Sequence, residues 1–185
     1  MLTLSANLIL MCSSTRYGCQ TPPRSPDLAT GLYQKYHIMG TLALCSLGLD
    51  DWDYFSGEDV APDVANAART RMAEYILPIC LNATVYYDEH YPLSKDGNHK
   101  LDMFPSQGEE TWQCPQPKNR SGCTTNPASD IAGLWAITQR LLRTDLTAGD
   151  KPLIDANTAV SLRQLIARIP TLPVGPRPYL LPSSQ

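Results

Sequence analysis

The sequence predicts an all-α protein, and three observations support this fold class. Four segments place apolar residues three and four positions apart, which is the spacing of one buried face of a helix. Prolines stand in the first turn of two of these segments and directly after another, where helices begin and end. No segment shows a competing strand pattern. A chain of 185 residues suits one domain with one modest core.

The first predicted helix spans residues 32–49. Gly40 lies inside it and weakens a helix by about 1 kcal/mol relative to alanine, so we expect it to mark a point of close packing. The aromatic and acidic residues 50–57 then end the helix. Its apolar face is formed by Leu32, Tyr36, Met39, Ala43, Cys45 and Leu47.

The second predicted helix begins near Pro62, a residue favoured in a first turn, and continues to about His90. Pro78 lies in its interior, where it cannot donate a backbone hydrogen bond and should kink the helix. The apolar face is formed by Ala65, Ala68, Met72, Ile76, Ile79, Ala83, Tyr86 and Tyr87.

The third predicted helix begins after Asn126, which we expect to cap it. Pro127 occupies the first turn, and Asp130 complements the positive end of the helix dipole. Its apolar face is formed by Ile131, Leu134, Trp135, Thr138, Leu141 and Leu142.

The fourth predicted helix begins near residue 157 or 158 and ends at Pro170. Its core face is formed by Leu162, Leu165, Ile166 and Ile169.

The two ends of the chain differ in composition from its middle. Residues 1–30 show no lasting periodicity and are predicted to be loosely structured, residues 31–175 form the helical domain, and residues 176–185 are a Pro-rich tail. The apolar run 2–11 is too short to span a membrane. It is also a weak signal peptide, because no Lys or Arg precedes it.

Charge and motifs exclude several classes of function. The net charge is −3, and no run of Lys or Arg appears, which argues against nucleic acid and anionic membranes as partners. No CxxC pair occurs, and the three histidines lack ligand spacing, so we expect no metal. The chain has no phosphate-binding Gly-rich loop, no HExxH motif and no nucleophile elbow. We therefore expect no cofactor.

A long loop over residues 92–125 carries the pattern that points to chemistry. If this loop is extended, Glu110 and Trp112 share one side, while Gln107 and Glu109 face the other. An indole stacks on the apolar face of a sugar ring, and it raises the pKa of a neighbouring carboxyl by removing water from it. The pattern therefore suits a sugar site, although an ordinary polar loop with a half-buried tryptophan would look the same.

Several segments resemble the six-hairpin glycosidases. Residues 33–54 resemble a helix of that family with its aromatic end, and residues 77–91 resemble the next helix, which also has a proline in its middle. Residues 105–112 are similar to the family's loop ending in Glu-Thr-Trp. Residues 126–134 resemble the following helix, and residues 165–173 resemble the close of the next one.

The resemblance covers residues 31–175 and implies a fragment of an (α/α)6 barrel, with about two antiparallel helical hairpins and a long loop. The relatives are related to inverting α-L-fucosidases, in which a Pro-Ser-x-Ser-Pro-Glu loop carries the general acid. Pro105, Ser106 and Glu110 match that motif, whereas Gly108 and Glu109 depart from it.

The resemblance thus implies that Glu110 is the general acid of a glycoside hydrolase and that Gln107, Glu109 and Trp112 bind the sugar. It also implies an extracellular or secretory location for the parent family. Two hairpins lack the segments that supply the other catalytic groups of the barrel. A carbohydrate-binding or interaction remnant without activity, and a small secreted helical protein held by disulfides, are the alternatives.

The six cysteines fall into different settings. Cys45 and Cys80 lie in apolar helical patterns and are expected to be small buried hydrophobic residues. Cys114 and Cys123 flank a polar turn, which suits a disulfide if the protein is exported. Such a bond would contribute somewhat less than the ~3 kcal/mol expected for a fifteen-residue loop. The alternative is a pair of free thiols in an intracellular protein.

Overall fold

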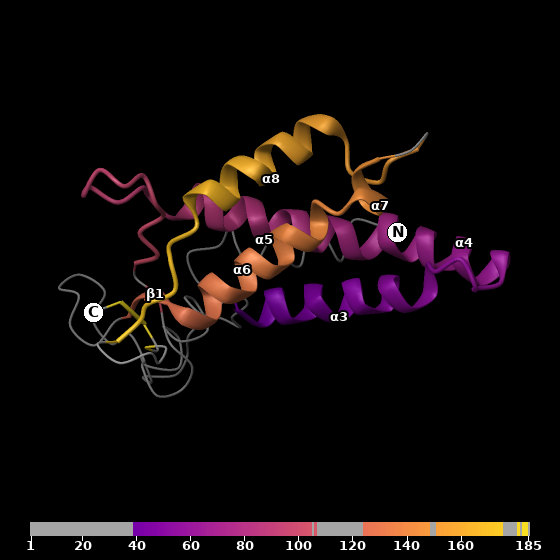
Figure 1. The fold of residues 1–185 in the computed structure, drawn as a ribbon, viewed down its shortest axis with the longest axis horizontal. Coiled ribbons are helices and arrows are strands. Elements are labelled where there is room, and N and C mark those ends of the chain that lie inside the picture. Colours follow the sequence, from indigo (N-terminus) through magenta and orange to yellow (C-terminus); the bar gives the residue numbers. More distant parts are fainter. Residues whose placement is uncertain are drawn as a thin grey trace, which may run out of the picture.

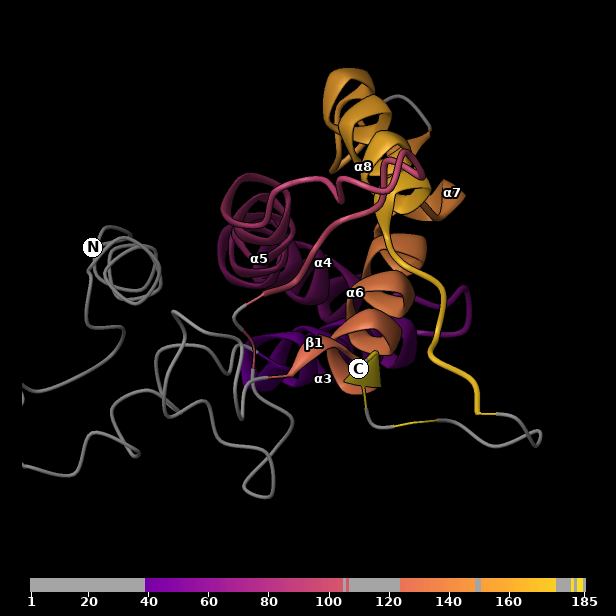
Figure 2. The ribbon, with the colours of Figure 1, turned by 90° about the vertical axis from the view of Figure 1, so that its left-hand side faces the viewer.

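The computed structural model describes residues 39–104, 106, 124–148, 151–175, 181 and 183–184. This part of the chain is mostly helical, which confirms the predicted all-α class (Figure 1). The helices form two antiparallel pairs that lie against each other. Residues 91–104, which follow the first pair, cross one end of both pairs (Figure 2).

The first pair consists of α3, Met39–Phe55, and a long helix that runs back beside it. The long helix is assembled from α4, Pro62–Arg71, the π-helical turn η1, Met72–Ile76, and α5, Leu77–His90. The predicted start at Pro62 and the predicted end near His90 are both confirmed.

The second pair consists of α6, Ala128–Leu141, and α8, Ala156–Arg168. The short helix α7, Thr144–Thr147, lies between them and was not predicted. Helix α6 packs on α3, and α8 packs on α6 and α5, so the two pairs share one core.

The π-helical turn lies directly before Pro78, where the sequence predicted a kink. The backbone N–H of Leu77 donates to the carbonyl oxygen of Met72, five residues back, instead of four. A proline ring clashes with the carbonyl oxygen four residues earlier, here that of Glu74. A wider turn relieves that clash, which explains why the irregularity appears here.

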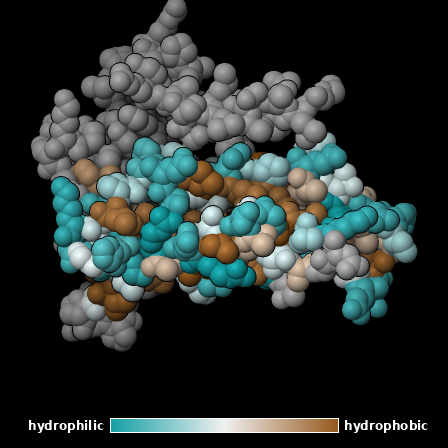
Figure 3. Space-filling view, turned by 90° about the horizontal axis from the view of Figure 1, so that it is seen from above, coloured by the Kyte–Doolittle hydropathy of each residue, from teal (hydrophilic) through white to brown (hydrophobic). Residues whose placement is uncertain are grey.

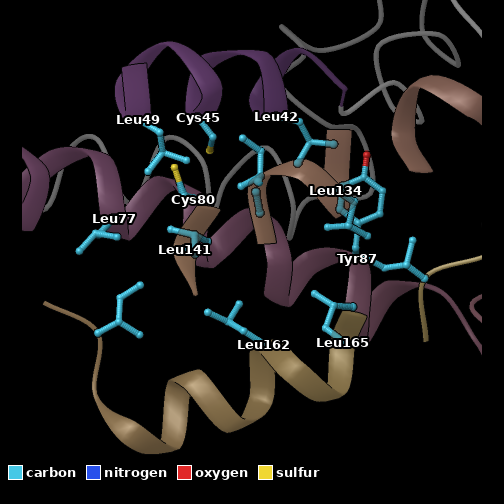
Figure 4. Close-up of a cluster of buried hydrophobic side chains, with 14 of the residues drawn as sticks. Leu42, Cys45, Leu49, Leu77, Cys80, Tyr87, Leu134, Leu141, Leu162 and Leu165 are labelled. Carbon is cyan, nitrogen blue, oxygen red and sulfur yellow. The ribbon is translucent and has the colours of Figure 1, made fainter. Parts of the chain in front are cut away.

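Buried leucines, cysteines and aromatic side chains from all the long helices form one hydrophobic core (Figure 4). Helix α3 contributes Leu42, Cys45, Leu49 and Trp52. Two predictions about α3 were therefore wrong. Its core face does not include Ala43 or Leu47, which are exposed. The helix also continues past residue 49, because Trp52 is buried and donates from its indole N–H to Asp145 at 2.7 Å.

Helix α6 departs from its prediction at three places, and the first is that Pro127 precedes the helix as its N-cap residue instead of lying in the first turn. Asn126 does not cap the helix, because its side-chain oxygen accepts a hydrogen bond from the N–H of Met103 at 2.8 Å. Trp135 is 52% exposed, and Ile137 is buried in its place. The other members of the predicted face, apart from the half-buried Leu142, are buried.

Helix α8 begins slightly earlier than predicted. Asp155 is its N-terminal cap, accepting hydrogen bonds from the backbone N–H groups of Asn157 at 2.9 Å and Thr158 at 3.0 Å. Hydrogen bonds from the side chain and then the backbone of Thr158 lower the pKa of Asp155 below its ordinary value. On the core face, Ile166 is only half-buried.

Two glycines allow α3 to approach its neighbours closely. A Cβ atom at Gly48 would lie 2.7 Å from the Cγ2 atom of Ile76, and one at Gly133 would lie 3.0 Å from the Cδ1 atom of Leu42. Gly40, which was predicted to mark close packing, has no atom within 4 Å of such a Cβ. The prediction chose the wrong glycine of α3, since local sequence does not reveal which one faces a neighbour.

Hydrophilic side chains cover much of the surface on the side of α8, and a broken strip of hydrophobic side chains lies among them (Figure 3). Large hydrophobic side chains are also exposed on α3 and α6, with Leu47 67% exposed and Tyr54 77% exposed. The described helices therefore leave part of their apolar surface uncovered.

Replacement of Gly48 by alanine should lower the free energy of unfolding by about 1–2 kcal/mol. The added methyl group collides with a β-branched side chain, and overpacking of this kind costs typically ~1–3 kcal/mol, which outweighs a gain in helix propensity of up to about 1 kcal/mol. Urea unfolding of Gly40→Ala is the matched control and should show no loss. Equal stability of the two variants would contradict the close contact between α3 and η1.

Candidate functional site

The candidate site lies at the end of the helical bundle where α5 ends and α6 begins. We call it the loop end, and it is formed by Tyr87, Tyr91, Ser106, Thr124 and Asp130. The N–H of Ser106 donates to the carbonyl oxygen of Thr124 at 3.2 Å, and the N–H of Thr124 donates back at 3.1 Å. This pair of hydrogen bonds joins the two stems of the loop, which are the chain segments that lead into and out of residues 107–123.

The residues that the sequence predicted for the site, and the predicted disulfide, all belong to that loop. They lie outside the described residues: Gln107, Glu109, Glu110, Trp112, Cys114 and Cys123. The structure therefore describes the base of the loop and the helix ends beneath it. The roles of the six residues stay predictions.

A tyrosine and an aspartate form a buried polar contact beneath the loop. The hydroxyl of Tyr87, on α5, donates a hydrogen bond to a carboxylate oxygen of Asp130, in the first turn of α6. Tyr87 is 0% exposed and Asp130 is 1% exposed. The hydroxyl of Ser129 lies 3.4 Å from the other carboxylate oxygen of Asp130. The contact ties the end of one helical pair to the start of the other.

The environment of Tyr87 keeps its hydroxyl protonated. Burial, followed by the negative charge of Asp130, raises the pKa of Tyr87 well above its ordinary value. The tyrosine is therefore a permanent donor, while Asp130 also benefits from the positive end of the α6 dipole. Together they can hold a buried carboxylate at this end of the fold.

Sequence reasoning placed Asp130 in the first turn but missed its burial and its partner. A signal was available, because Asp130, Leu134 and Thr138 are spaced by four residues, and all three are buried. Tyr87 likewise follows the buried Cys80 and Ala83 along one face of α5. Two polar groups on facing apolar stripes must find a partner, and here they find each other.

Aromatic rings gather at the end of α5. The rings of Tyr86 and His90 are stacked, with centroids 4.6 Å apart and planes inclined by 14°. Tyr91 packs against His90 at 4.8 Å and against Tyr87 at 5.9 Å, and it is 3% exposed. The half-buried Tyr86 and the exposed His90 therefore offer ring surface beside the buried tyrosines.

Two buried hydroxyl groups lie at the base of the loop. Ser106 is 1% exposed and Thr124 is 3% exposed. Within the part of the chain that the structure describes, neither side-chain oxygen has a hydrogen-bond partner. An unpaired buried hydroxyl costs about 1–3 kcal/mol, so both groups favour any polar partner that reaches them.

Several contacts hold the segments around the loop base. Asn126 has a positive φ of 51° and exchanges hydrogen bonds with Met103, so each stem is anchored to the other. The strand β1, Thr125–Pro127, pairs with β2, Ser183–Ser184, which brings part of the predicted Pro-rich tail to this end. The loop base is thus held on both sides.

The end of α8 is fastened to the same region. Arg168 forms an ion pair with Asp88 of α5, with an Nη2–Oδ1 distance of 2.6 Å. The N–H of Leu101 donates to the carbonyl oxygen of Arg168 at 2.8 Å, and the Lys100 ammonium donates to that of Ala167 at 2.8 Å. These bonds satisfy carbonyl groups that a helix leaves unpaired at its C-terminus.

The described residues offer no metal site and no membrane span. Among them, no group of three or more His, Cys, Asp or Glu side chains could hold a metal ion. The helices found in these same ranges are all too short or too polar to cross a membrane.

Comparisons of the chain with protein-family models, with curated proteins and with solved structures find no match. The resemblance to six-hairpin glycosidases therefore remains a prediction from the sequence. The candidate site is defined by the residues and the geometry of this chain.

Replacement of Tyr87 by phenylalanine should lower the free energy of unfolding by about 1–3 kcal/mol, because the buried Asp130 loses the hydrogen bond from the tyrosine hydroxyl. The loss should shrink above about pH 10. Above that pH, Tyr87 loses its proton in the unfolded chain but keeps it in the folded one, because its folded pKa is raised. This ionisation favours the unfolded state of the wild type and has no counterpart in the Tyr87→Phe variant.

The control is Tyr75→Phe, since Tyr75 is 52% exposed on η1. It should change stability by less than about 0.5 kcal/mol in the same denaturant titrations. A similar loss in both variants, or a Tyr87→Phe loss that does not depend on pH, would show that the buried pair does not stabilise the fold.

Proposed function

We propose that the chain is a glycoside hydrolase-like helical unit that binds carbohydrate at the loop end, with Glu110 as the general acid. One observation carries the proposal. The stems of the loop that contains Glu110 and Trp112 meet at Ser106 and Thr124, over the helix ends that bury Asp130. The end of a helical bundle beneath a long loop is where a barrel of hairpins would place its sugar pocket.

Chain length supports this placement of the proposed acid. Glu110 follows Ser106 by four residues. An extended chain spans at most ~3.6 Å per residue, so their Cα atoms can be no more than about 14 Å apart. This limit allows the proposed acid to reach the loop end.

The chemistry of a sugar site explains the proposed roles. Glycoside hydrolysis needs a protonated carboxylic acid beside the leaving oxygen and a second group on the opposite face of the sugar. Trp112 would stack on the sugar and help to keep the carboxyl of Glu110 protonated. Gln107 and Glu109 would bind sugar hydroxyl groups.

The second carboxylate of an inverting site would stand ~6.5–9.5 Å from the acid. Three aspartates are described near this end. Asp130 accepts from Tyr87, and Asp88 is paired with Arg168. The half-buried Asp102 lies in the stem of the loop. We therefore propose that the two hairpins are part of an (α/α)6 barrel and that further hairpins supply the base. The exposed apolar side chains of α3 and α6 are consistent with such neighbours.

The meeting of the loop stems at Ser106 and Thr124 also favours a second candidate, which is carbohydrate binding without hydrolysis. If the described aspartates at this end only stabilise the fold, the loop end can hold a sugar but cannot activate water. The two candidates share one binding site and differ in turnover, so one set of variants separates them.

Trp112→Ala should weaken saccharide binding by at least about tenfold, because stacking on an indole is lost. The measurement is a saccharide array followed by calorimetric titration of the best ligand, including α-L-fucosides. Trp135→Ala is the matched control, since Trp135 is half-exposed on α6, and it should bind normally. Absence of any saccharide ligand would refute both candidates.

Hydrolysis is tested with aryl glycosides that carry good or poor leaving groups. If the chain turns them over, Glu110→Gln should reduce the rate by about 10²–10⁴-fold on poor leaving groups and by less on good ones. Glu109→Gln is the matched comparison: because Glu109 is proposed to bind sugar hydroxyl groups, its loss should weaken binding to the same extent for good and poor leaving groups. Binding without turnover in the unaltered chain would establish the second candidate, and equal losses in both variants would remove Glu110 as the acid.

A further inference from the structure

Two free cysteines face each other inside the core. Cys45 belongs to α3 and is 1% exposed, and Cys80 belongs to α5 and is 0% exposed. Their sulfur atoms point toward each other across the boundary between the two helices (Figure 4). A side-chain hydrogen bond with Cys45, followed by burial, raises the pKa of the Cys80 thiol far above its ordinary value. The two sulfur atoms therefore lie side by side in the core, and the Cys80 thiol keeps its proton.

A close helix contact lies one turn away from the two cysteines. Gly48 lies one turn after Cys45 on α3, and Ile76 lies one turn before Cys80. The missing side chain of Gly48 is what lets Ile76 approach, since a Cβ atom there would lie only 2.7 Å away. A disulfide requires Cα atoms within about 7 Å and side chains that converge. The glycine-mediated contact brings the two helices together beside the cysteines, and the two side chains converge.

We propose that Cys45 and Cys80 form a disulfide that joins α3 to α5 when the protein folds in the presence of a disulfide oxidant. The two thiols lose two protons and two electrons as the sulfur–sulfur bond forms. A small disulfide such as oxidised glutathione accepts them and becomes two thiols, by way of a mixed disulfide with one of the cysteines.

Burial determines when this exchange can occur. The attacking species is a thiolate, and the folded core disfavours it strongly while excluding the oxidant. Bond formation therefore belongs to folding, or to moments when α3 separates from α5. Once formed, the same burial protects the bond from reductants. The oxidation state of the two cysteines is thus set by the redox conditions during folding and is kept afterwards.

The bond would stabilise the first helical pair. It closes a loop of about 35 residues that contains the turn between α3 and α4 and the π-helical turn. Restricting a loop of this size in the unfolded chain should raise the melting temperature by roughly 10 °C. The effect does not depend on the proposed carbohydrate site, which lies at the far end of α5.

The experiment uses the full chain with Cys12, Cys19, Cys114 and Cys123 replaced by serine. The protein is unfolded, reduced, and refolded with either reduced or oxidised glutathione. Alkylation under denaturing conditions and mass spectrometry then count the free thiols. We expect two thiols after the reduced refolding and none, in a monomer without glutathione adducts, after the oxidised refolding.

Thermal unfolding of the two products should differ by the roughly 10 °C stated above. Cys45→Ala and Cys80→Ala in the same background should show no difference between the two refolding conditions. Two alkylated thiols, glutathione adducts or intermolecular dimers after oxidised refolding would overturn the proposal. A cross-linked monomer that melts no higher than the reduced one would overturn the claim of stabilisation. The thiol count and the melting temperatures are both measured on the protein that retains Cys45 and Cys80. The test therefore does not depend on whether the alanine variants fold.

Discussion

The close packing of α3 between its two neighbours is the constraint on which the fold depends. Gly48 admits Ile76 of the long helix, and Gly133 of α6 admits Leu42. Each contact is possible only where a glycine leaves space for the neighbouring side chain. The positions of the glycines therefore determine where along their axes the helices meet. The core face of α3, centred on Cys45, is a consequence of this double contact.

That arrangement also determines the polar chemistry at the loop end. With α5 and α6 both held against α3, the end of one lies beside the start of the other, and Tyr87 meets Asp130. A carboxylate in the first turn of a helix would ordinarily face water. Here it is buried because the helical period places it in line with the core residues of α6, and the tyrosine satisfies it. The loop stems are anchored above this pair.

Local signals in the sequence predicted the helices, and long-range contacts limited what else could be predicted. Pro62 and Pro170 marked helix boundaries correctly, since a proline acts on its own turn. The buried faces of α3 and α6 were partly wrong, because Leu47 and Trp135 fit a helical period whose partner lies elsewhere in the chain. Asn126 was misassigned for the same reason, as its partner Met103 is distant in sequence. The site residues of the loop lie outside the described residues, so their prediction stands as made from the sequence.

The most direct measurement is a titration of the isotopically labelled chain with its best saccharide ligand, followed by the NMR shifts of backbone amides. Carbohydrate binding at the loop end predicts saturating shifts at Ser106, Thr124 and Asp130, with little change at the opposite end of the helical bundle near Pro62. Shifts centred on Pro62, or shifts spread evenly over the chain without saturation, would contradict a sugar site beneath the loop.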